Sequence, residues 1–505
     1  MSVARTFTAQ PGVLRGDVVT IETDLTRGLH AFTVVGLAGK AVEEAKDRVS
    51  AAIKNSGFSS PKSTNHKIVV SLAPADLKKE GPLFDLPIAV SYLVANGSIE
   101  AELNGKILIG ELALDGTLRP VRGVLPAIEA AKQAGYTEAI IPKANAKEAA
   151  LVADITITPA ESLLEVVNHL DVSREDHALL DAQPATTIGT SWSTSQTSLE
   201  DVKGQETAKR GLIIAAAGRH NVLMVGPPGT GKTMLARAFR SLLPPLSREE
   251  ALEVLSIHSL VGELTEDISS DPPFRAPHHT ASHTSLVGGG TYPKPGEVTL
   301  AHKGVLFMDE FPEFERRSLD ALRQPLEDRV VAITRVQGTA IFPADFVLLA
   351  ALNPYRGTED GSTDYGAAMM DTYKQKVSGP ILDRIDLWLP VPHVPYETLT
   401  SSPTKTGETE AAQTAISNAR QLQAKRLQNR GITTNATMTA RDIEELIDLS
   451  DEVKVLLKTS SEKLNLSPRS YHRLIKVSRT IADLESSEQI EKHHVLEALQ
   501  YRVQV

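Results

Sequence analysis

Hydrophobic and polar positions in the first 170 residues follow two spacings. Strands are predicted where β-forming residues cluster or alternate, at residues 17–23, 30–35, 67–72, 106–109 and 139–141. Helices are predicted where apolar residues recur three or four positions apart, at residues 39–56, 86–94 and 124–134. We therefore expect residues 1–170 to form an α/β domain.

Two polar stretches divide the rest of the chain. Residues 171–197 and 399–413 are rich in Ser and Thr and lack apolar periodicity, so they are interpreted as linkers. Between them, residues 198–398 alternate strands and helices, which is typical of a parallel sheet covered on both faces. Residues 414–505 have helical spacing throughout and predict an all-α C-terminal domain.

The helical part carries two start signals. Thr439 and Asp442 have the spacing of a capping box. Ser467 and Pro468 form a good helix start, because proline is favoured at the first helical position. These signals predict helices that begin near residues 440 and 468.

Composition limits the class of protein. With 505 residues, two to four domains are expected. No apolar run approaches the roughly 20 residues that cross a bilayer, and the N-terminus lacks the apolar core of a signal peptide. We therefore expect a cytoplasmic protein without a membrane partner. The chain has no cysteine, which excludes disulfides, a cysteine nucleophile and a thiolate zinc site; no structural zinc is expected.

The net charge of −10 argues against a surface that coats nucleic acid. It leaves open a protein that grips DNA inside a pore, where a few local cations suffice.

A phosphate-binding loop stands near the middle of the chain. A short apolar strand, residues 221–225, leads into a glycine-rich turn and then a helix from residue 234. This context is that of a Walker A motif, in which backbone N–H groups and the helix N-terminus face phosphate oxygens. Its residues are Gly226, Pro227, Pro228, Gly229, Thr230, Gly231, Lys232 and Thr233. Lys232 is predicted to bind the β- and γ-phosphates of ATP, and Thr233 a magnesium ion.

Two further strands end in polar residues. Residues 304–308 precede Asp309 and Glu310, the pattern of a Walker B motif. Asp309 is the predicted second magnesium residue, and Glu310 the general base that polarises the attacking water. Residues 346–352 precede Asn353, which is predicted to orient that water. An asparagine before proline is also a common turn former.

Together these residues resemble the AAA+ superfamily, and within it the magnesium-chelatase and minichromosome-maintenance branch. By this resemblance Asn353 is similar to sensor 1, and Arg384, in Ser378–Asp386, to an arginine finger that enters a neighbouring site. Arg469, on one helical face with Arg473 and Lys476, is similar to sensor 2. Gln205 resembles the loop residue against the adenine.

The resemblance narrows to the ComM/YifB family of magnesium-chelatase-like proteins. It rests on residues 274–283, 286–290, 296–304, 80–88 and 498–502. The family implies a Lon-C-terminal-like α/β front domain, a P-loop AAA+ αβα sandwich and an all-α lid. It also implies homo-hexameric rings that translocate on DNA and drive branch migration in recombination and natural transformation.

The chain departs from the family in two places. Several cysteines usual after sensor 1 are absent, because residues 355–364 contain none. The front domain resembles a Ser–Lys protease, yet Leu83 occupies the serine position and Ala127 lies near the lysine position. Without a nucleophile, Lys132 has nothing to activate. Residues 1–170 are therefore interpreted as a non-proteolytic structural or binding module.

Two segments are candidates for DNA contact. Residues 274–303 resemble the helix-2 insert of this branch, and residues 329–342 predict a hairpin with its turn near residue 337. The candidate phosphate contacts are Lys294, Arg329 and Arg335. Three histidines at 278, 279 and 283 suggest a metal, but their spacing favours loop packing or hydrogen bonding.

Three functions remain open at this point. A DNA-remodelling ATPase ring, acting as a helicase or translocase on single-stranded or branched DNA, is favoured. A protein-remodelling AAA+ machine would use the front domain as an adaptor. A chelatase-type metal-insertion ATPase is less favoured, because such a subunit has no need of that domain.

Overall fold

The structure, a computed structural model, describes residues 3–12, 16–192, 197–264, 268–290, 294–335, 338–353, 377–400 and 407–502, with the backbone alone at 335, 338, 339, 399 and 400. The chain divides into two compact units. The front unit is Met1–Gly189 with Ala251–Ser269, and the main unit is Thr190–Glu250 with Ser270–Val505. The stretch predicted as one ATPase core, 198–398, is thus interrupted by residues 251–269, which cluster with the front unit.

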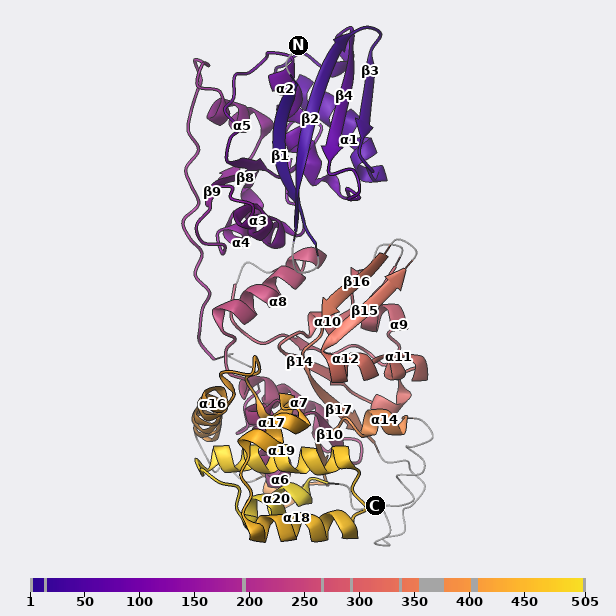
Figure 1. Cartoon of the computed structure of the whole chain (residues 1–505), viewed down its shortest axis with the longest axis vertical. Helices are drawn as coiled ribbons and strands as arrows, with labels where there is room; N and C mark the ends of the chain where they lie inside the picture. Colours follow the sequence, from indigo (N-terminus) through magenta and orange to yellow (C-terminus); the bar gives the residue numbers. More distant parts are fainter. Residues whose placement is uncertain are drawn as a thin grey trace. The chain divides into compact units, whose positions relative to one another are not determined.

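The front unit contains a four-stranded sheet in the order β1-β2-β4-β3 (Figure 1). Its strands are β1 (Ala4–Gln10), β2 (Asp17–Arg27), β3 (Ala31–Val35) and β4 (His66–Ala73). The strands β3 and β4 are parallel, and the other pairs are antiparallel. Sequence analysis missed β1 because two of its buried positions are the threonines Thr6 and Thr8, which give no hydrophobic alternation. The buried Thr6 hydroxyl donates to the Pro87 carbonyl at 3.0 Å, which satisfies it.

A smaller parallel sheet completes the front unit. It has the order β5-β8-β9, from β5 (Lys106–Leu108), β8 (Glu138–Pro142) and β9 (Thr156–Ala160), beside a hairpin of β6 (Glu111–Leu112) and β7 (Leu118–Arg119). The helices of this unit are α1 (Lys40–Asn55), α2 (Asp85–Ala95), α3 (Val124–Gln133), α4 (Ala146–Ala149) and α5 (Leu163–Leu170). The three helices predicted before residue 135 are therefore confirmed to within two residues at each end. The front unit is α/β, and its Lon-C-terminal-like assignment stays a prediction.

Leu83 and Ala127, at the positions compared with a Ser–Lys dyad, are both buried in the front unit. Nearby, the buried carboxylate of Asp85 accepts hydrogen bonds from the Arg48 guanidinium at 2.8 and 3.0 Å. Burial nevertheless raises the pKa of Asp85 to about 6, against the opposing effect of Arg48. These positions hold packing residues and an ion pair.

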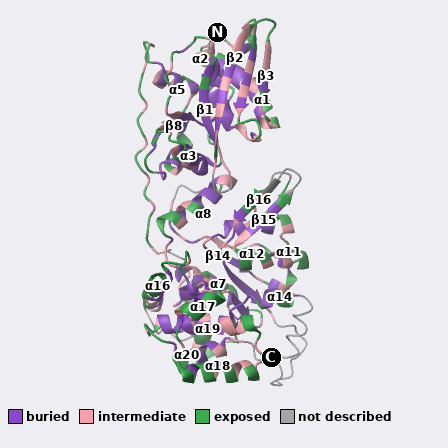
Figure 2. Cartoon of the chain, in the orientation of Figure 1, coloured by how far each residue is buried: buried purple, intermediate pink, exposed green. Residues whose placement is uncertain are grey.

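The main unit is built on a five-stranded parallel sheet in the order β11-β14-β17-β10-β18. The strands are β10 (Val222–Val225), β11 (Phe274–Arg275), β14 (Val305–Met308), β17 (Val347–Leu352) and β18 (Leu387–Pro390). Strands β14 and β17 are buried along their whole length (Figure 2), as expected for a parallel sheet covered on both faces. Sequence analysis predicted β10, β14 and β17 to within one residue.

Helices and short hairpins surround this sheet. The helices are α6 (Glu206–Gly218), α7 (Lys232–Ser241), α9 (His283–Val287), α10 (Glu297–Leu300), α11 (Arg316–Ala321), α12 (Arg323–Asp328) and α14 (Gly379–Leu382), and α8 (Arg248–Val261) begins in this unit. The hairpins are β12 (Gly288–Gly289) with β13 (Lys294–Pro295), and β15 (Val330–Arg335) with β16 (Gly338–Pro343). The predicted hairpin over 329–342 is confirmed by the pairing of β15 and β16, and its turn lies outside the described residues.

The C-terminal part of the main unit is helical. It contains α15 (Tyr396–Thr400), α16 (Glu408–Leu427), α17 (Ala440–Leu446), α18 (Asp451–Lys463), α19 (Pro468–Leu484) and α20 (Lys492–Gln500). Both predicted helix starts are confirmed. The Thr439 hydroxyl accepts from the Asp442 N–H while the Asp442 carboxylate accepts from the Thr439 N–H, and the Ser467 hydroxyl caps α19. These helices share one hydrophobic core with the sheet.

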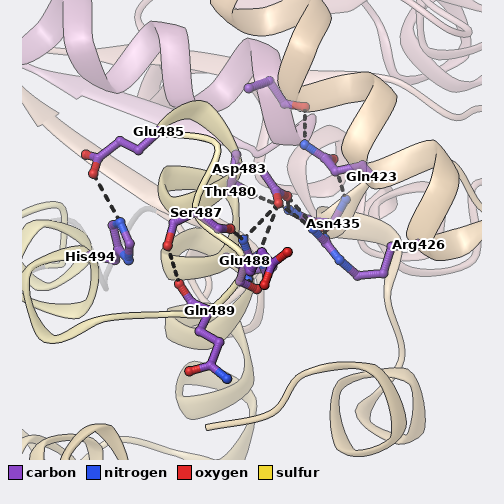
Figure 3. Close-up of polar contacts among 12 residues, drawn as sticks. Gln423, Arg426, Asn435, Thr480, Asp483, Glu485, Ser487, Glu488, Gln489 and His494 are labelled. Atoms are coloured by element: carbon purple, nitrogen blue, oxygen red, sulfur yellow. Dashed lines mark hydrogen bonds and ion pairs between the residues drawn. The ribbon is translucent and has the colours of Figure 1, made fainter. Parts of the chain in front are cut away.

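A buried polar network fixes α19 against the rest of this lid (Figure 3). The Asp483 carboxylate, fully buried, accepts from the Arg426 guanidinium and from the Asn435 amide at 2.8 Å. Gln423 joins the network to the core by donating to the Ala217 carbonyl of α6 at 3.1 Å. A buried charge with this many partners is satisfied, and the network therefore sets the position of the helix that carries Arg469 and its neighbours.

Candidate active site

The loop after β10 has a backbone that only glycine fits at several points. Gly229 and Gly231 have φ of 78° and 92°, in the left-handed region that side chains disfavour. A Cβ on Gly226 would lie 2.0 Å from the Val391 carbonyl oxygen. The loop ends at the N-terminus of α7, the ten-residue helix that begins at Lys232. Backbone N–H groups and the positive end of the helix dipole therefore face the same concavity.

Lys232 and Thr233 are positioned by this loop. The Lys232 ammonium donates to the carbonyls of Gly226 and Pro227, both at 2.7 Å, and the residue is only 6% exposed. Burial lowers the pKa of Lys232, and the Asp309 carboxylate opposes that shift. The Thr233 hydroxyl donates to the Asp309 carboxylate at 2.8 Å. Two oxygen groups from separate motifs thus meet where a divalent cation would need them.

Asp309 and Glu310 follow β14 in a turn. The Glu310 N–H donates to the Asp309 carboxylate at 2.9 Å, and Glu310 itself has φ of 51°. This conformation directs the two carboxylates differently, since Asp309 contacts Thr233 while a carboxylate oxygen of Glu310 lies 3.1 Å from His279 Nδ1. His279 is thus a neighbour of the predicted base that sequence analysis did not assign, although a hydrogen-bonding role was favoured over a metal.

Asn353 lies beside these residues because its strand lies between theirs. In β17, Ala350 pairs with Met308 of β14 and Leu352 with Val225 of β10. The three strands run parallel, so the segments that follow them leave the same edge of the sheet, which we call the carboxyl edge. The phosphate loop, the Asp309–Glu310 turn and Asn353 are therefore brought together, as the motifs predicted.

A cavity of about 300 Å³ lies next to the loop. It is lined by residues 204–207 and by residues between 390 and 398. The Gln205 amide donates to the Pro392 carbonyl at 2.6 Å and to the Thr230 carbonyl at 3.4 Å, so it joins both walls to the phosphate loop. The size and the mainly apolar lining suit a purine base, and the role predicted for Gln205 against the adenine stays a prediction.

Arg384 and Arg469 lie at the opposite edge of the sheet. The Arg384 carbonyl accepts from the Asn221 side chain at 3.0 Å, and the Asp386 N–H donates to the Asn221 carbonyl at 2.9 Å. Asn221 immediately precedes β10, and Asp386 immediately precedes β18, so this is the edge where the strands begin, the amino edge. The predicted catalytic residues therefore form two groups, one at each edge of one sheet.

The amino edge holds a charged cavity of about 570 Å³, here called the arginine pocket. Its lining includes the cationic side chains of Arg219, Arg329, Arg384, Arg469, Arg473 and Lys476, and the acids Glu327, Asp345 and Asp386. Burial lowers the pKa of Lys476 to about 8 despite the opposing Asp386, and burial also lowers the pKa of Arg473. The excess of positive charge suits an anionic ligand such as a phosphate.

One acid holds the two candidate arginines together. The Glu327 carboxylate accepts from Arg384 through one oxygen and from Arg469 through the other, the second at 2.8 Å. Arg384 is 90% shielded, donates also to the Pro380 carbonyl, and leaves its Nε atom without a partner among the described residues. These arginines pull the pKa of Glu327 below its usual range. Sequence analysis did not single out Glu327, an exposed acid without a motif.

The three candidate DNA contacts do not form one group. Lys294 is exposed on β13. Arg329 lies in the arginine pocket, 3.8 Å from Asp345, and not at the tip of the β15–β16 hairpin. The side chain of Arg335 lies outside the described residues.

A second cluster of titratable residues lies in the lid (Figure 3). The Glu485 carboxylate contacts His494 Nε2 at 3.1 Å, as Figure 3 shows. It also contacts His493 Nε2 at 2.9 Å. The Glu491 N–H donates to His494 Nδ1 at 2.9 Å, so a neutral His494 carries its proton on Nε2, facing Glu485. This cluster is therefore explained as a helix cap with an ion pair rather than as a metal site.

Family models match three parts of the chain. Residues 198–399 match the model described as magnesium chelatase, subunit ChlI; residues 21–145 match subunit ChlI of Mg-chelatase; and residues 406–502 match its C-terminal model.

No helix among the described residues is both long and apolar enough to cross a membrane.

Individual relatives match over the full length. The chain is 45% identical over 513 residues to competence protein ComM of Haemophilus influenzae, covering 100% of this chain and 98% of that protein. It is 42% identical to the uncharacterized protein YifB of Salmonella typhimurium, covering 99% and 97%. A shorter similarity, 31% over 179 residues, relates 30% of this chain to 32% of Lon protease 2 of Bacillus subtilis.

Proposed function

The chain belongs to the ComM/YifB family of magnesium-chelatase-like AAA+ proteins, and we propose that it is an ATP-hydrolysing ring that acts on DNA. The observation that carries the proposal is the division of the catalytic residues between the two edges of one sheet. The phosphate loop, Asp309, Glu310 and Asn353 lie at the carboxyl edge, and Arg384 and Arg469 at the amino edge. Two neighbouring subunits would combine them into one site.

At the carboxyl edge the chain binds ATP. The backbone N–H groups between Gly226 and Lys232 hold the phosphates, Lys232 adds a positive charge, and the base fits against Gln205. Thr233 and Asp309 would hold a magnesium ion, which neutralises negative charge on the β- and γ-phosphates. The direct contact of these two side chains at 2.8 Å is the observation that supports this metal position.

Hydrolysis needs a base and an oriented water. Glu310 accepts a proton from the water as it attacks the γ-phosphate, and Asn353 holds that water by a hydrogen bond. Glu310 follows β14 and Asn353 follows β17, and these two strands are neighbours in the sheet. Their side chains are therefore brought close to each other without long connecting loops. His279 keeps the Glu310 side chain in one place while the site is open.

Arg384 cannot serve the nucleotide of its own chain. The four residues of β10 alone separate the two edges by roughly 13 Å, at about 3.3 Å per residue. A head-to-tail contact would put the amino edge of one subunit against the carboxyl edge of the next, and repetition closes a ring. In such a ring, a guanidinium beside the γ-phosphate stabilises the charge that develops during transfer. A homo-hexamer is our proposal for the ring.

DNA is the proposed substrate on two grounds. A relative covered over 98% of its length is named competence protein ComM, and the family resemblance implies an action on DNA. The chain also carries two hairpins inserted between strands of the main sheet. The β12–β13 hairpin lies between β11 and β14 in the sequence, and the β15–β16 hairpin lies between β14 and β17. Exposed Lys294 offers a phosphate contact on the first of them. Branch migration of recombination intermediates is the activity we propose.

The test is the ATPase rate measured across a range of protein concentrations, with and without a four-way DNA junction. A shared site predicts a specific activity that rises steeply as rings assemble, and DNA that raises it further. A rate per subunit that is independent of protein concentration would contradict the proposal that the active site is shared between subunits of a ring. Assembled rings that ignore the junction but respond to unfolded polypeptide would favour a protein-remodelling machine, and a response to porphyrin with partner subunits would favour a metal-insertion ATPase.

A further inference from the structure

Glu327 stands at the only point among the described residues where Arg384 and Arg469 meet. It lies in the last turn of α12 and receives a guanidinium on each carboxylate oxygen. The two arginines come from segments 57 and 142 residues away in sequence. No local backbone feature could fix their separation, whereas a shared carboxylate does.

The surroundings of Glu327 make this contact more than an ordinary surface ion pair. Arg384 and Arg469 stand in a pocket lined by four more cationic side chains. Like charges repel, so the two guanidiniums would move apart without an acid between them. The Arg384 side chain is largely shielded, and its buried Nε has no hydrogen-bond partner among the described residues. The Arg469 side chain is 41% exposed, so its guanidinium keeps hydrogen-bonding capacity for a further anion.

We propose that Glu327 is a positioning residue that holds Arg384 and Arg469 as a pair, so that both reach the phosphates bound by the neighbouring subunit. The proposal rests on the proposed ring ATPase, and adds to it a residue of the arginine side that touches no nucleotide. It also makes the two arginines one unit, which removal of the acid should disable together.

The first test compares kcat and KM for ATP in assembled rings of the wild type, Glu327→Gln, Glu327→Ala and Glu327→Asp. Glu327→Ala should lower kcat about ten- to hundredfold, the range for losing a charge-assisted hydrogen bond, and change KM by less than about threefold. Glu327→Asp should recover part of the loss. Asp328→Asn is the matched control, since this neighbouring acid is exposed on the same helix and takes no part in the two ion pairs. An unchanged kcat in Glu327→Ala would overturn the proposal.

A purely structural role would produce a different pattern. The Glu327 side chain is half exposed, so its loss should cost little stability, and rings of the variant should assemble as the wild type does by light scattering. In an Arg384→Ala background, Glu327→Ala should have little further effect, because the residue acts through the arginines. Independent, multiplying losses would contradict that dependence.

Mixed rings give the decisive result. Glu310→Gln subunits lack the base but keep the arginine side, and Glu327→Ala subunits have the reverse defect. Random mixing creates intact sites at about one interface in four, so activity should return. Mixtures of Glu327→Ala with Arg384→Ala should not exceed the average of the two single-variant rates, because both variants are defective on the arginine side; recovery above that average would overturn the proposal. If instead the wild type shows no ATPase, or Arg384→Ala is fully active, it is the proposed function that fails.

Discussion

At the carboxyl edge of the main sheet the candidate residues stand on the segments that follow three neighbouring strands, whereas at the amino edge they come from α12, from the turn after α14 and from α19. The first group occupies positions 226–233, 309–310 and 353, and its geometry is set by the register of β14, β17 and β10. The second group depends on Glu327, Arg384 and Arg469, joined through side chains alone. The backbone thus fixes one half of the proposed site, and ion pairs fix the other.

The two edges differ in how easily their residues can move. Parallel strands give residues that cannot shift without disturbing a buried core. Guanidinium–carboxylate pairs at a half-exposed surface can break and form again at small cost. The amino edge is therefore the half whose state can change when subunits assemble.

The largest effect is expected at the amino edge. Arg384→Ala should lower kcat about a thousandfold, because an arginine finger stabilises charge on the transferred phosphoryl group. Binding of ATP, measured with a fluorescent analogue, should stay within a few-fold of the wild type, since the phosphate loop is intact. Loss of binding together with loss of turnover would mean that the two edges are not independent.

At the carboxyl edge, Glu310→Gln should lower kcat about a hundredfold or more by removing the base. Single-turnover measurements should show bound ATP that persists. The control is Glu313→Gln, an acid three residues on that follows the same turn. Turnover equal to the wild type would remove Glu310 from the role of base.

At the amino edge, Asp386 is also expected to contribute to the free energy of unfolding. Burial alone would raise the pKa of Asp386, but neighbouring His220 and the charges of Arg473 and Lys476 hold that pKa below its usual range. A lowered pKa contributes stability above the unfolded-state value of 3.8, and this stability is lost as the pH falls below it, because the unfolded chain takes up the proton first. Asp386→Asn should cost roughly 2 kcal/mol at pH 7.

The same variant should lose less stability than the wild type between about pH 5 and pH 3. Tryptophan fluorescence reports the main unit selectively, since both tryptophans, Trp192 and Trp388, belong to it. Parallel acid-unfolding curves for the two proteins would show that Asp386 does not carry this part of the pH dependence. Asp328→Asn, an exposed acid, serves as the comparison.

The smallest effect is expected for His279→Ala. Its ion pair orients Glu310, but the turn after β14 already places that residue, so kcat should fall by less than about tenfold. Added zinc, with magnesium held in excess, should change the rates of the wild type and of His279→Ala equally. A metal-dependent loss of activity that disappears in His279→Ala would return His279 to a metal role.

The carboxyl edge could be predicted from sequence because each functional residue stands beside a short apolar strand. Asp309 and Asn353 needed only the rule that parallel strands end at one edge. Glu327 could not be found in that way, because its proposed role depends on contacts with Arg384 and Arg469, which lie 57 and 142 positions away in the sequence. His279 was noticed for its type, yet its partner Glu310 lies 31 positions away (310 − 279).

Secondary structure followed the same rule. Helix α1, which has an apolar stripe, was predicted to within one residue at each end, and the start of α19 was predicted at Pro468. Strand β1 was missed because hydroxyls and small side chains fill its buried positions. The separation of residues 251–269 from the sheet unit was missed as well, since nothing in their spacing says which core they join.

Only Asp328 and Arg329 separate Glu327 from the start of the β15–β16 hairpin. Arg329 ends α12 with φ of 58°, and its carbonyl accepts from the Ala344 N–H at 2.8 Å, which ties the base of the hairpin to that helix end. The end of the helix and the base of the hairpin are thus joined by a two-residue connection and a backbone hydrogen bond. If the proposed ring holds DNA at this hairpin, a displacement of the hairpin would act on Glu327, and through it on the arginines proposed to complete the next subunit's site.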